Sequence, residues 1–141
     1  QYKNAKCYVA VVFDVEVDTA SGQIHLTNAA IAGDAGQIVN PDGLANQLEG
    51  GVLQAASWTL KEQVHYGRDW DTYPVLRFAG IPAVSVILLD QPSTPSLGSG
   101  EATQGPTPAA IANAVFDAAG VRLREMPFTP ERVKAALAQL Q

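Results

Sequence analysis

The spacing of hydrophobic and polar residues changes along this chain, and each spacing predicts a different element. Residues 8–17 (YVAVVFDVEV) begin as a β-branched, apolar run and pass into alternation with acids. A polar segment containing Ser21-Gly22 follows, and residues 24–35 return as a second strand-like stretch. Two such stretches joined by a short turn predict a β-hairpin.

From Asn40 the spacing becomes that of a helix. Asn40, Pro41 and Asp42 are residue types preferred at the N-cap, at the first helical position and in the first turn. Positions expected to be buried then recur every three or four residues: Leu44, Leu48, Val52, Ala55, Thr59 and Leu60. This periodicity predicts a long helix from Pro41 to about Val64.

The second half of the chain predicts a strand and two shorter helices. Residues 83–90 (AVSVILLD) form the best strand candidate, expected at the centre of the sheet. Residues 108–119 predict an alanine-rich helix ended by Gly120, and Thr129-Pro130-Glu131 begins a last helix. The apolar stripe of that helix is expected to be Val133, Ala136, Leu137 and Leu140.

Together these elements predict an α+β fold. A β-hairpin and a further strand are expected to pack with a long helix and two shorter C-terminal helices, as a single domain of residues 1–141. Residues 69–78 (DWDTYPVLRF) predict an irregular packed segment whose aromatic side chains enter the core. A salt bridge from Arg77 is expected to hold it.

Composition narrows the function classes. The net charge of −5 and the absence of a basic stripe argue against nucleic acid, and no apolar run is long enough to span a bilayer. Apolar residues make up 47% of the chain and charged residues only 16%, which indicates a surface partly covered by partners.

Several residues with reactive or ligating side chains are best explained structurally. The single cysteine, Cys7, excludes an internal disulfide and a cysteine-based metal site, and is interpreted as a small apolar residue at a strand start. Asp14, Glu16 and Asp18 have the period of a solvated strand face. His25 and His65 lack a second ligand at metal-binding spacing.

A glycine-rich stretch surrounds one carboxylate. Residues 97–108 (LGSGEATQGPTP) place three glycines and two prolines around Glu101. Such a composition is typical of a surface turn, and it also suits a loop that wraps tightly against another group and presents Glu101 to it.

Two adjacent glycines interrupt the long predicted helix. Gly50 and Gly51 each cost roughly 1 kcal/mol relative to alanine in a helix interior. Tight packing against another segment would explain them, and so would close approach of a ligand to the face that also carries Gln47 and Gln54.

Two long segments resemble one enzyme family. Residues 98–133 (GSGEATQGPTPAAIANAVFDAAGVRLREMPFTPERV) and residues 40–62 (NPDGLANQLEGGVLQAASWTLKE) occur in the order found in that family. They resemble the C-terminal part of the molybdenum-binding subunit of the xanthine oxidase and aldehyde oxidase family of molybdenum hydroxylases. The resemblance is to the isoquinoline 1-oxidoreductase and aldehyde dehydrogenase branch.

The resemblance implies roles for individual residues. Glu101 would be the general base, and Gln47, Gly50, Gly98 and Gly100 would contact the cofactor; Glu49 is a weaker candidate. The cofactor would be molybdopterin in its cytosine dinucleotide form, held mainly by parts outside this chain. No residue here would ligate the metal. Ala102-Thr103-Gln104 follows Glu101 where the family often has a proline or another small residue, so the loop shape is expected to differ.

The resemblance also implies partners. We expect a fragment, a cleavage product or one piece of a split subunit, acting with the remainder of the molybdenum subunit, an iron–sulfur subunit and a flavin or cytochrome acceptor subunit. The substrate would be an aldehyde or N-heterocycle, with water as the oxygen source. We expect the isolated chain to be inactive and not to retain the cofactor. A non-catalytic structural or interaction module is the alternative, and cytoplasm and periplasm both remain open.

Overall fold

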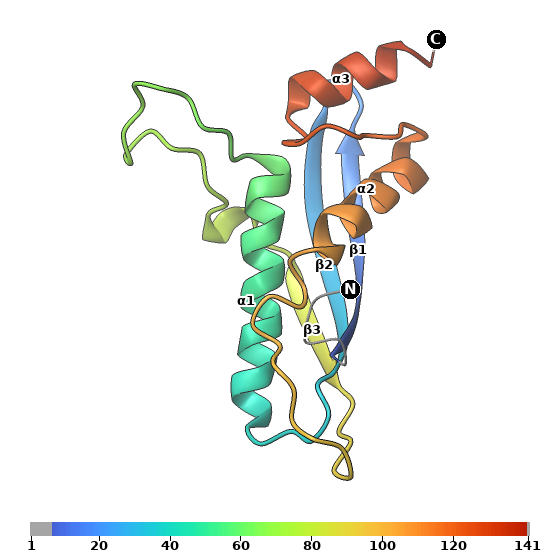
Figure 1. Cartoon of the computed structure of the whole chain (residues 1–141). Helices are drawn as coiled ribbons and strands as arrows, with labels where there is room; N and C mark the ends of the chain where they lie inside the picture. Colours follow the sequence, from blue (N-terminus) through green and yellow to red (C-terminus); the bar gives the residue numbers. More distant parts are fainter. Residues whose placement is uncertain (1–6, 141) are drawn as a thin grey trace.

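The computed structural model describes residues 7–140 and confirms the α+β fold. Strands β1 (Tyr8–Asp18), β2 (Gln23–Asp34) and β3 (Ala83–Leu88) form a sheet in the order β1-β2-β3. β1 and β2 are the predicted antiparallel hairpin, and β3 runs parallel to β2 (Figure 1). Parallel neighbours need a crossover connection, and the long helix between β2 and β3 in the chain is part of it.

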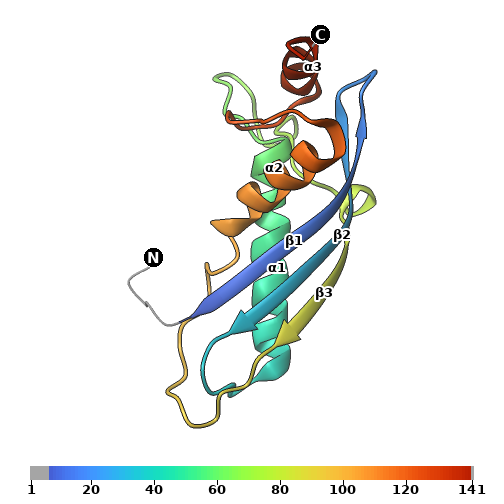
Figure 2. The ribbon, with the colours of Figure 1, turned by 90° about the vertical axis from the view of Figure 1, so that its right-hand side faces the viewer.

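Two helices cover one face of this sheet. These are α1 (Pro41–Leu60) and α2 (Pro106–Ala119), and α3 (Pro130–Ala138) lies beside the hairpin turn (Figures 1 and 2). A short 3₁₀ turn, η1 (Phe78–Gly80), precedes β3. The largest fully buried apolar side chains lie between the sheet and the helices: Ile31, Leu48, Val52, Ile111, Val115 and Val133. None of the described helices is long and apolar enough to cross a membrane.

Local capping signals were predicted correctly. The Asn40 side chain accepts a hydrogen bond from the Gly43 backbone N–H at 3.0 Å, and Thr129 caps α3 in the same way. Gly120 ends α2 with a φ of 71°. α2 begins at Pro106, two residues before the predicted start, because Pro106 occupies the first helical position after Gly105.

Helix α1 ends at Leu60 rather than near Val64. The hydroxyl of Ser57 accepts a hydrogen bond from the Leu76 backbone N–H at 2.9 Å, so a returning segment packs against the last turn. Lys61 has a φ of −132°, outside the helical region. The final predicted stripe is also shorter, because Leu140 lies beyond α3 and is 61% exposed.

Strand β3 lies at the edge of the sheet, so its predicted central position is wrong. The central strand is β2, which pairs with both β1 and β3. An apolar run predicts a strand, but it carries no information about which strands will be its neighbours. The residues of β3 alternate between half-buried and exposed.

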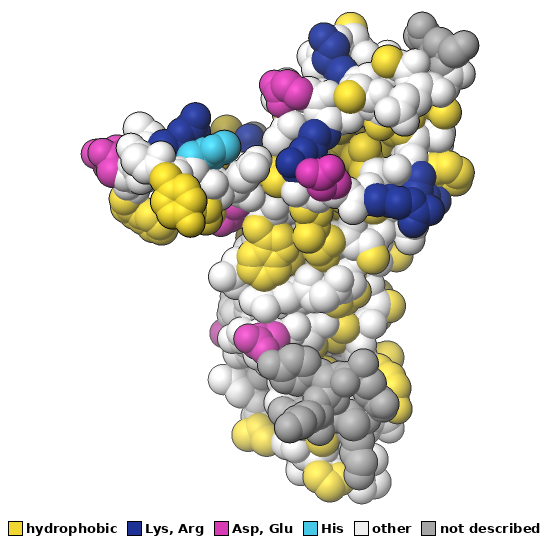
Figure 3. All heavy atoms as spheres, turned by 45° about the horizontal axis from the view of Figure 1, so that its top comes forward, with side chains coloured by type: hydrophobic (Ala, Val, Ile, Leu, Met, Phe, Trp, Pro, Cys, Tyr) yellow, Lys and Arg dark blue, Asp and Glu magenta, His cyan; other side chains and the backbone are white. Residues whose placement is uncertain are grey.

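The segment that follows α1, residues 61–77, forms an arm that is largely exposed apart from half-buried residues 73–76, of which Leu76 packs against the core. The predicted entry of aromatic side chains into the core is wrong for Trp70 and Phe78. The arm projects from the body (Figure 1), and it carries hydrophobic side chains on its surface (Figure 3). Trp70 is 81% exposed and stacks on Tyr73 with a centroid separation of 6.0 Å; Phe78, just beyond the arm, is 93% exposed. Arg77 forms no salt bridge with any described residue, so the predicted salt bridge is absent from the described part of the chain.

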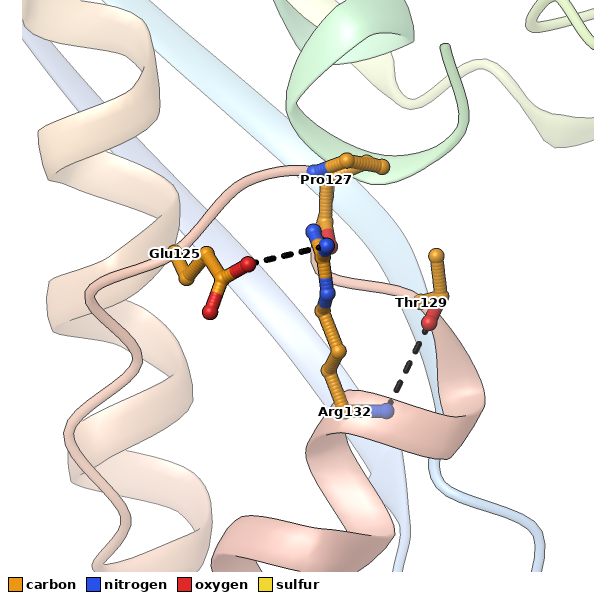
Figure 4. Close-up of polar contacts among 4 residues, drawn as sticks. All are labelled: Glu125, Pro127, Thr129 and Arg132. Carbon is orange, nitrogen blue, oxygen red and sulfur yellow. Dashed lines mark hydrogen bonds and ion pairs between the residues drawn. The ribbon is translucent and has the colours of Figure 1, made fainter. Parts of the chain in front are cut away.

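The approach to α3 is held by one arginine. Nη2 of Arg132 lies 3.0 Å from Oε1 of Glu125, and Nη1 donates to the Pro127 carbonyl at 3.0 Å (Figure 4). Glu125 is largely exposed, so this ion pair contributes little to stability. The two contacts mainly fix the direction in which the chain enters the helix.

The candidate ligating residues lie on the surface, except for Cys7. Asp14, Glu16 and Asp18 are exposed along β1, and His25 and His65 are exposed as well. Hydrogen bonds from the Ser21 hydroxyl and from backbone N–H groups hold the pKa of the Asp18 carboxyl below its usual value. Partial burial, and then Asp34, raise the pKa of the Cys7 thiol, which favours its unreactive form. Within residues 7–140, no three His, Cys, Asp or Glu side chains gather as a metal site.

We predict that the hairpin turn and α3 stabilise each other through Gly22. Gly22 has a φ of 80°, and a Cβ there would clash with the Pro130 carbonyl oxygen. Gly67 has a φ of 85° but no described atom within 4 Å of such a Cβ. Gly22→Ala should therefore lower the free energy of unfolding by about 1–3 kcal/mol more than Gly67→Ala. Urea unfolding measures both, and equal losses would contradict the predicted coupling.

Candidate functional site

The glycine-rich loop lies along helix α1, so two segments far apart in the sequence become neighbours (Figure 1). Three side-chain hydrogen bonds join them. Gln47 Nε2 donates to the Gly100 carbonyl at 2.9 Å, Thr103 Oγ1 donates to the Leu48 carbonyl at 3.0 Å, and Gln104 Nε2 donates to Gln54 Oε1 at 2.8 Å. We call this region the loop–helix site; it comprises Gln47, Gly50, Gly51 and Gln54 of α1 with Gly98, Gly100, Glu101, Thr103 and Gln104.

Thr103 and Gly51 form the closest contact of the loop–helix site. Thr103 is 1% exposed, and a Cβ added to Gly51 would clash with its hydroxyl oxygen. Gly51 therefore has a structural cause, because it lets the loop approach the helix backbone closely enough for Thr103 to bond Leu48. The Thr103 carbonyl also accepts from Thr107 Oγ1 at 2.7 Å, which continues the same contact into α2.

The preceding part of the loop is fastened just before α1. The Leu97 backbone N–H donates to the Ala35 carbonyl at 2.9 Å, and Ser96 Oγ donates to the Gln37 carbonyl at 2.6 Å. Gly36 has a φ of 72°, and its backbone lies against the Pro95 carbonyl. The loop is thus attached both to the connection that leads into α1 and to α1 itself.

Glu101 lies on the exposed side of the loop–helix site. The Ala102 backbone N–H donates to the Ser99 carbonyl, and the Gln104 N–H donates to the Glu101 carbonyl, each at 3.2 Å. These successive turns set the backbone on both sides of the carboxylate. Its neighbour Gly100 is the residue that Gln47 binds, so the structure brings the predicted base and the predicted cofactor contact to one place.

Gly50 and Gly100 differ from Gly51. Neither has a positive φ, and no described atom lies within 4 Å of a Cβ added to either. The fold of this chain therefore does not itself require glycine at these two positions. Gly98 is likewise exposed in the loop, and Glu49 is half-buried on α1. No side chain of the described residues covers the Gly50 and Gly100 positions beside Gln47.

Sequence reasoning did not find Thr103 and Gln104 as site residues, since it treated them only as departures from a family pattern. The available signal was Gly51, because a glycine inside a helix indicates that another segment approaches closely. What the pattern could not reveal was which segment.

Comparison with known proteins identifies the family. Residues 1–82 match the family of the molybdopterin cofactor-binding domain, and this is more than half of the 141 residues. The chain therefore belongs to the molybdopterin cofactor-binding domain family. The match includes α1 with Gln47 and Gly50, and it ends before the loop that carries Glu101.

Relatives of known name agree with this family. The chain is 46% identical over 136 residues to a nicotinate dehydrogenase subunit of Pseudomonas putida, an alignment that covers 92% of this chain and 12% of that protein. It is 31% identical over 148 residues to the beta subunit of isoquinoline 1-oxidoreductase of Brevundimonas diminuta, with 99% and 18% covered. The predicted resemblance to molybdenum-binding subunits is confirmed, and the relatives are oxidoreductases.

Solved structures share the fold. The aldehyde oxidoreductase of Desulfovibrio gigas superimposes with a TM-score of 0.85 at 28% identity, covering 94% of this chain and 15% of that chain. Quinoline 2-oxidoreductase from Pseudomonas putida 86 gives 0.79 at 28% identity, with 89% and 18% covered. The chain spans less than a fifth of the length of each of these relatives.

The loop–helix site offers polar groups of the kind that a molybdopterin cofactor would need from the protein. Gln47 uses one amide hydrogen for Gly100, and its second amide hydrogen and carbonyl oxygen have no described protein partner. A pterin ring presents amide-like donors and acceptors that such a group can match. Among the described residues, no atom lies within 4 Å of a Cβ added to Gly50 or Gly100, so neither position blocks the approach of a flat ring to the backbone.

We predict opposite effects of alanine at the two helix glycines. Gly51→Ala should lower the free energy of unfolding by about 1–3 kcal/mol, because Thr103 is buried and cannot move aside. Gly50→Ala should be neutral or raise it by up to about 1 kcal/mol, because the site is open and alanine favours the helix. Urea unfolding of the two variants measures this difference, and a loss at Gly50 as large as that at Gly51 would contradict it.

Proposed function

We propose that this chain is the C-terminal part of a molybdopterin-binding subunit. It contributes to a molybdenum hydroxylase that oxidises an aldehyde or an N-heterocycle with an oxygen atom from water. The observation that carries this proposal is the set of three hydrogen bonds that hold the Glu101 loop against the Gln47 face of α1.

Glu101 is the proposed general base. The bound cofactor would supply the two-electron oxidation, and the protein must take up the proton that the reaction releases. A carboxylate on a loop fastened at both ends can be held within hydrogen-bond reach of the group that loses the proton. The bond from Gln47 holds Gly100, and the Ser99–Ala102 and Glu101–Gln104 turns hold the backbone before and after Glu101.

Gln47, Gly50, Gly98 and Gly100 are the proposed cofactor contacts. Gln47 would hold the pterin through the polar groups that it does not spend on Gly100. The glycines would allow the ring close to the backbone, which gives Gly50 a reason that the fold of this chain lacks. We propose the cytosine dinucleotide form of molybdopterin, with its phosphates held by parts of the subunit outside this chain.

The names of the relatives guide the choice of substrate. Nicotinate, isoquinoline and quinoline are N-heterocycles, and other relatives are named for aldehydes. The 46% identity to the nicotinate dehydrogenase subunit favours the first class, so nicotinate is the first compound to assay. An iron–sulfur subunit and a flavin or cytochrome acceptor subunit are the proposed partners for removal of electrons.

We predict that Glu101→Gln abolishes most turnover without loss of cofactor. The amide preserves the size of the side chain but cannot accept the proton, so kcat/KM should fall by about 10²–10⁴-fold. The measurement is steady-state turnover of the intact assembly, with molybdenum and pterin content determined on the same samples. Glu16→Gln on β1, which is exposed outside the loop–helix site, serves as the matched control. Undiminished turnover by Glu101→Gln would favour a non-catalytic structural or interaction module.

We predict that Gln47→Ala weakens cofactor retention. The variant loses the hydrogen bond to Gly100 and the proposed bonds to the pterin, so the affinity should fall by about 2–10-fold for each bond lost. Gln54→Ala is the control. Gln54 lies seven residues after Gln47 on the same helix, and the substitution removes only its bond to the Gln104 side chain. Pterin content after dialysis of the assembly separates the two. Equal content in both variants would count against a contact from Gln47.

A further inference from the structure

The face of the sheet turned away from α1 and α2 is divided into an apolar half and a polar half. Toward one end it carries the apolar side chains that we call the bare sheet patch: Tyr8, Ala10, Val12, Ala30, Ala32 and Ile87. Tyr8 is 68% exposed, Val12 62% and Ile87 60%. Toward the hairpin turn the same face carries exposed Asp14, Glu16 and Asp18.

Strand register shows that the patch is continuous. Ala10 lies opposite Ala32, and Ala32 lies opposite Ile87. Val12 lies opposite Ala30 in the next row. Residues directly opposite each other project on the same side of a sheet, so the row of Ala10, Ala32 and Ile87 is apolar across all three strands. The row of Val12 and Ala30 ends in Ser85 on β3, and Asp34 lies opposite Tyr8, so these two polar residues border the patch.

The sequence of β1 independently marks the same boundary. Residues 8–13 are apolar at every position, whereas residues 14–18 alternate, and the pairing register shifts between Asp14 and Val15. Strands buried on both faces have continuous apolar sequences, and strands with one solvated face alternate. The first half of β1 therefore has the sequence of a strand covered on both sides.

The edge of β3 has a similar character. Its six residues, Ala83–Leu88, contain no proline and no charged residue, and these are the usual devices that protect an exposed edge. Ile87 on the bare sheet patch belongs to this strand. An unprotected edge beside an exposed apolar face indicates an interface rather than a solvated surface.

We propose that the bare sheet patch is covered by a layer of the remainder of the molybdopterin-binding subunit. This inference rests on the proposed function. In the solved chains that share the fold, the region matched here is only 15% and 18% of the length, so those subunits have a large remainder that can pack on this region. A second copy of this chain fits less well, because it would bring a second acidic row and a second net charge of −5.

The test measures thiol accessibility in the intact assembly. Val12→Cys and Ile87→Cys place a thiol on the bare sheet patch, and Glu16→Cys places one on the polar half of the same face. Ala10→Cys repeats the test with a smaller change of volume, in case either larger substitution disturbs folding. Maleimide labelling, located by peptide mass spectrometry, should be slower by on the order of tenfold or more at the patch than in Glu16→Cys, since it would require local opening.

Crosslinking from the same thiols identifies the cover. A short bifunctional reagent attached at Val12→Cys should capture peptides of the molybdopterin-binding subunit that lie outside this sequence. Capture of a second copy of this sequence, or of a different subunit, would overturn the proposal. So would labelling of Val12→Cys and Ala10→Cys as fast as that of Glu16→Cys.

Molybdenum content and turnover are measured on the same samples to separate the two proposals. Fast labelling of the patch in an assembly that holds molybdenum and turns over substrate overturns the interface and leaves the proposed function standing. Recovery of the chain with no larger molybdenum-containing polypeptide overturns both.

Discussion

The loop–helix site depends on the contact between Thr103 and Gly51. A buried hydroxyl bonds the backbone carbonyl of Leu48, and it can do so only because the next turn of α1 lacks a side chain at position 51. The bonds from Gln47 and Gln104 lie on either side of this contact. A hydrogen bond at an exposed surface adds little stability by itself, so the buried Thr103 contact is the one that keeps the two exposed bonds in register.

Elements with strong local signals could be predicted from the sequence. The Asn40 cap, the hairpin turn at Gly22 and the stop at Gly120 are each determined by a few neighbouring residues. The position of β3 in the sheet could not be predicted, because its apolar run specifies a strand and not a neighbour. The exposed arm was missed for a related reason. An aromatic residue such as Trp70 or Phe78 looks the same in the sequence whether its side chain is buried in a core or exposed at the surface.

For the loop–helix site, local sequence patterns identified individual candidate residues but did not predict which of them lie close together. Glu101 was conspicuous within its glycines, and Gln47 was a polar residue on a helix face. Only the family resemblance suggested that they belong together. The structure adds the physical connection, which runs through Gly100 and through Thr103, a residue whose importance depends on a glycine 52 positions earlier.

The distance along the chain between the bonded partners of this site affects the order of assembly. Gln47 and Gly100 are separated by 53 residues, and Thr103 and Leu48 by 55. Contacts that close such long loops carry a large entropic cost and form after local helices and hairpins have formed. Helix α1 and the β1–β2 hairpin can thus exist before the site does. A cofactor that binds both α1 and the loop would therefore meet a complete binding surface only once these long-range contacts have formed, so its insertion would follow folding.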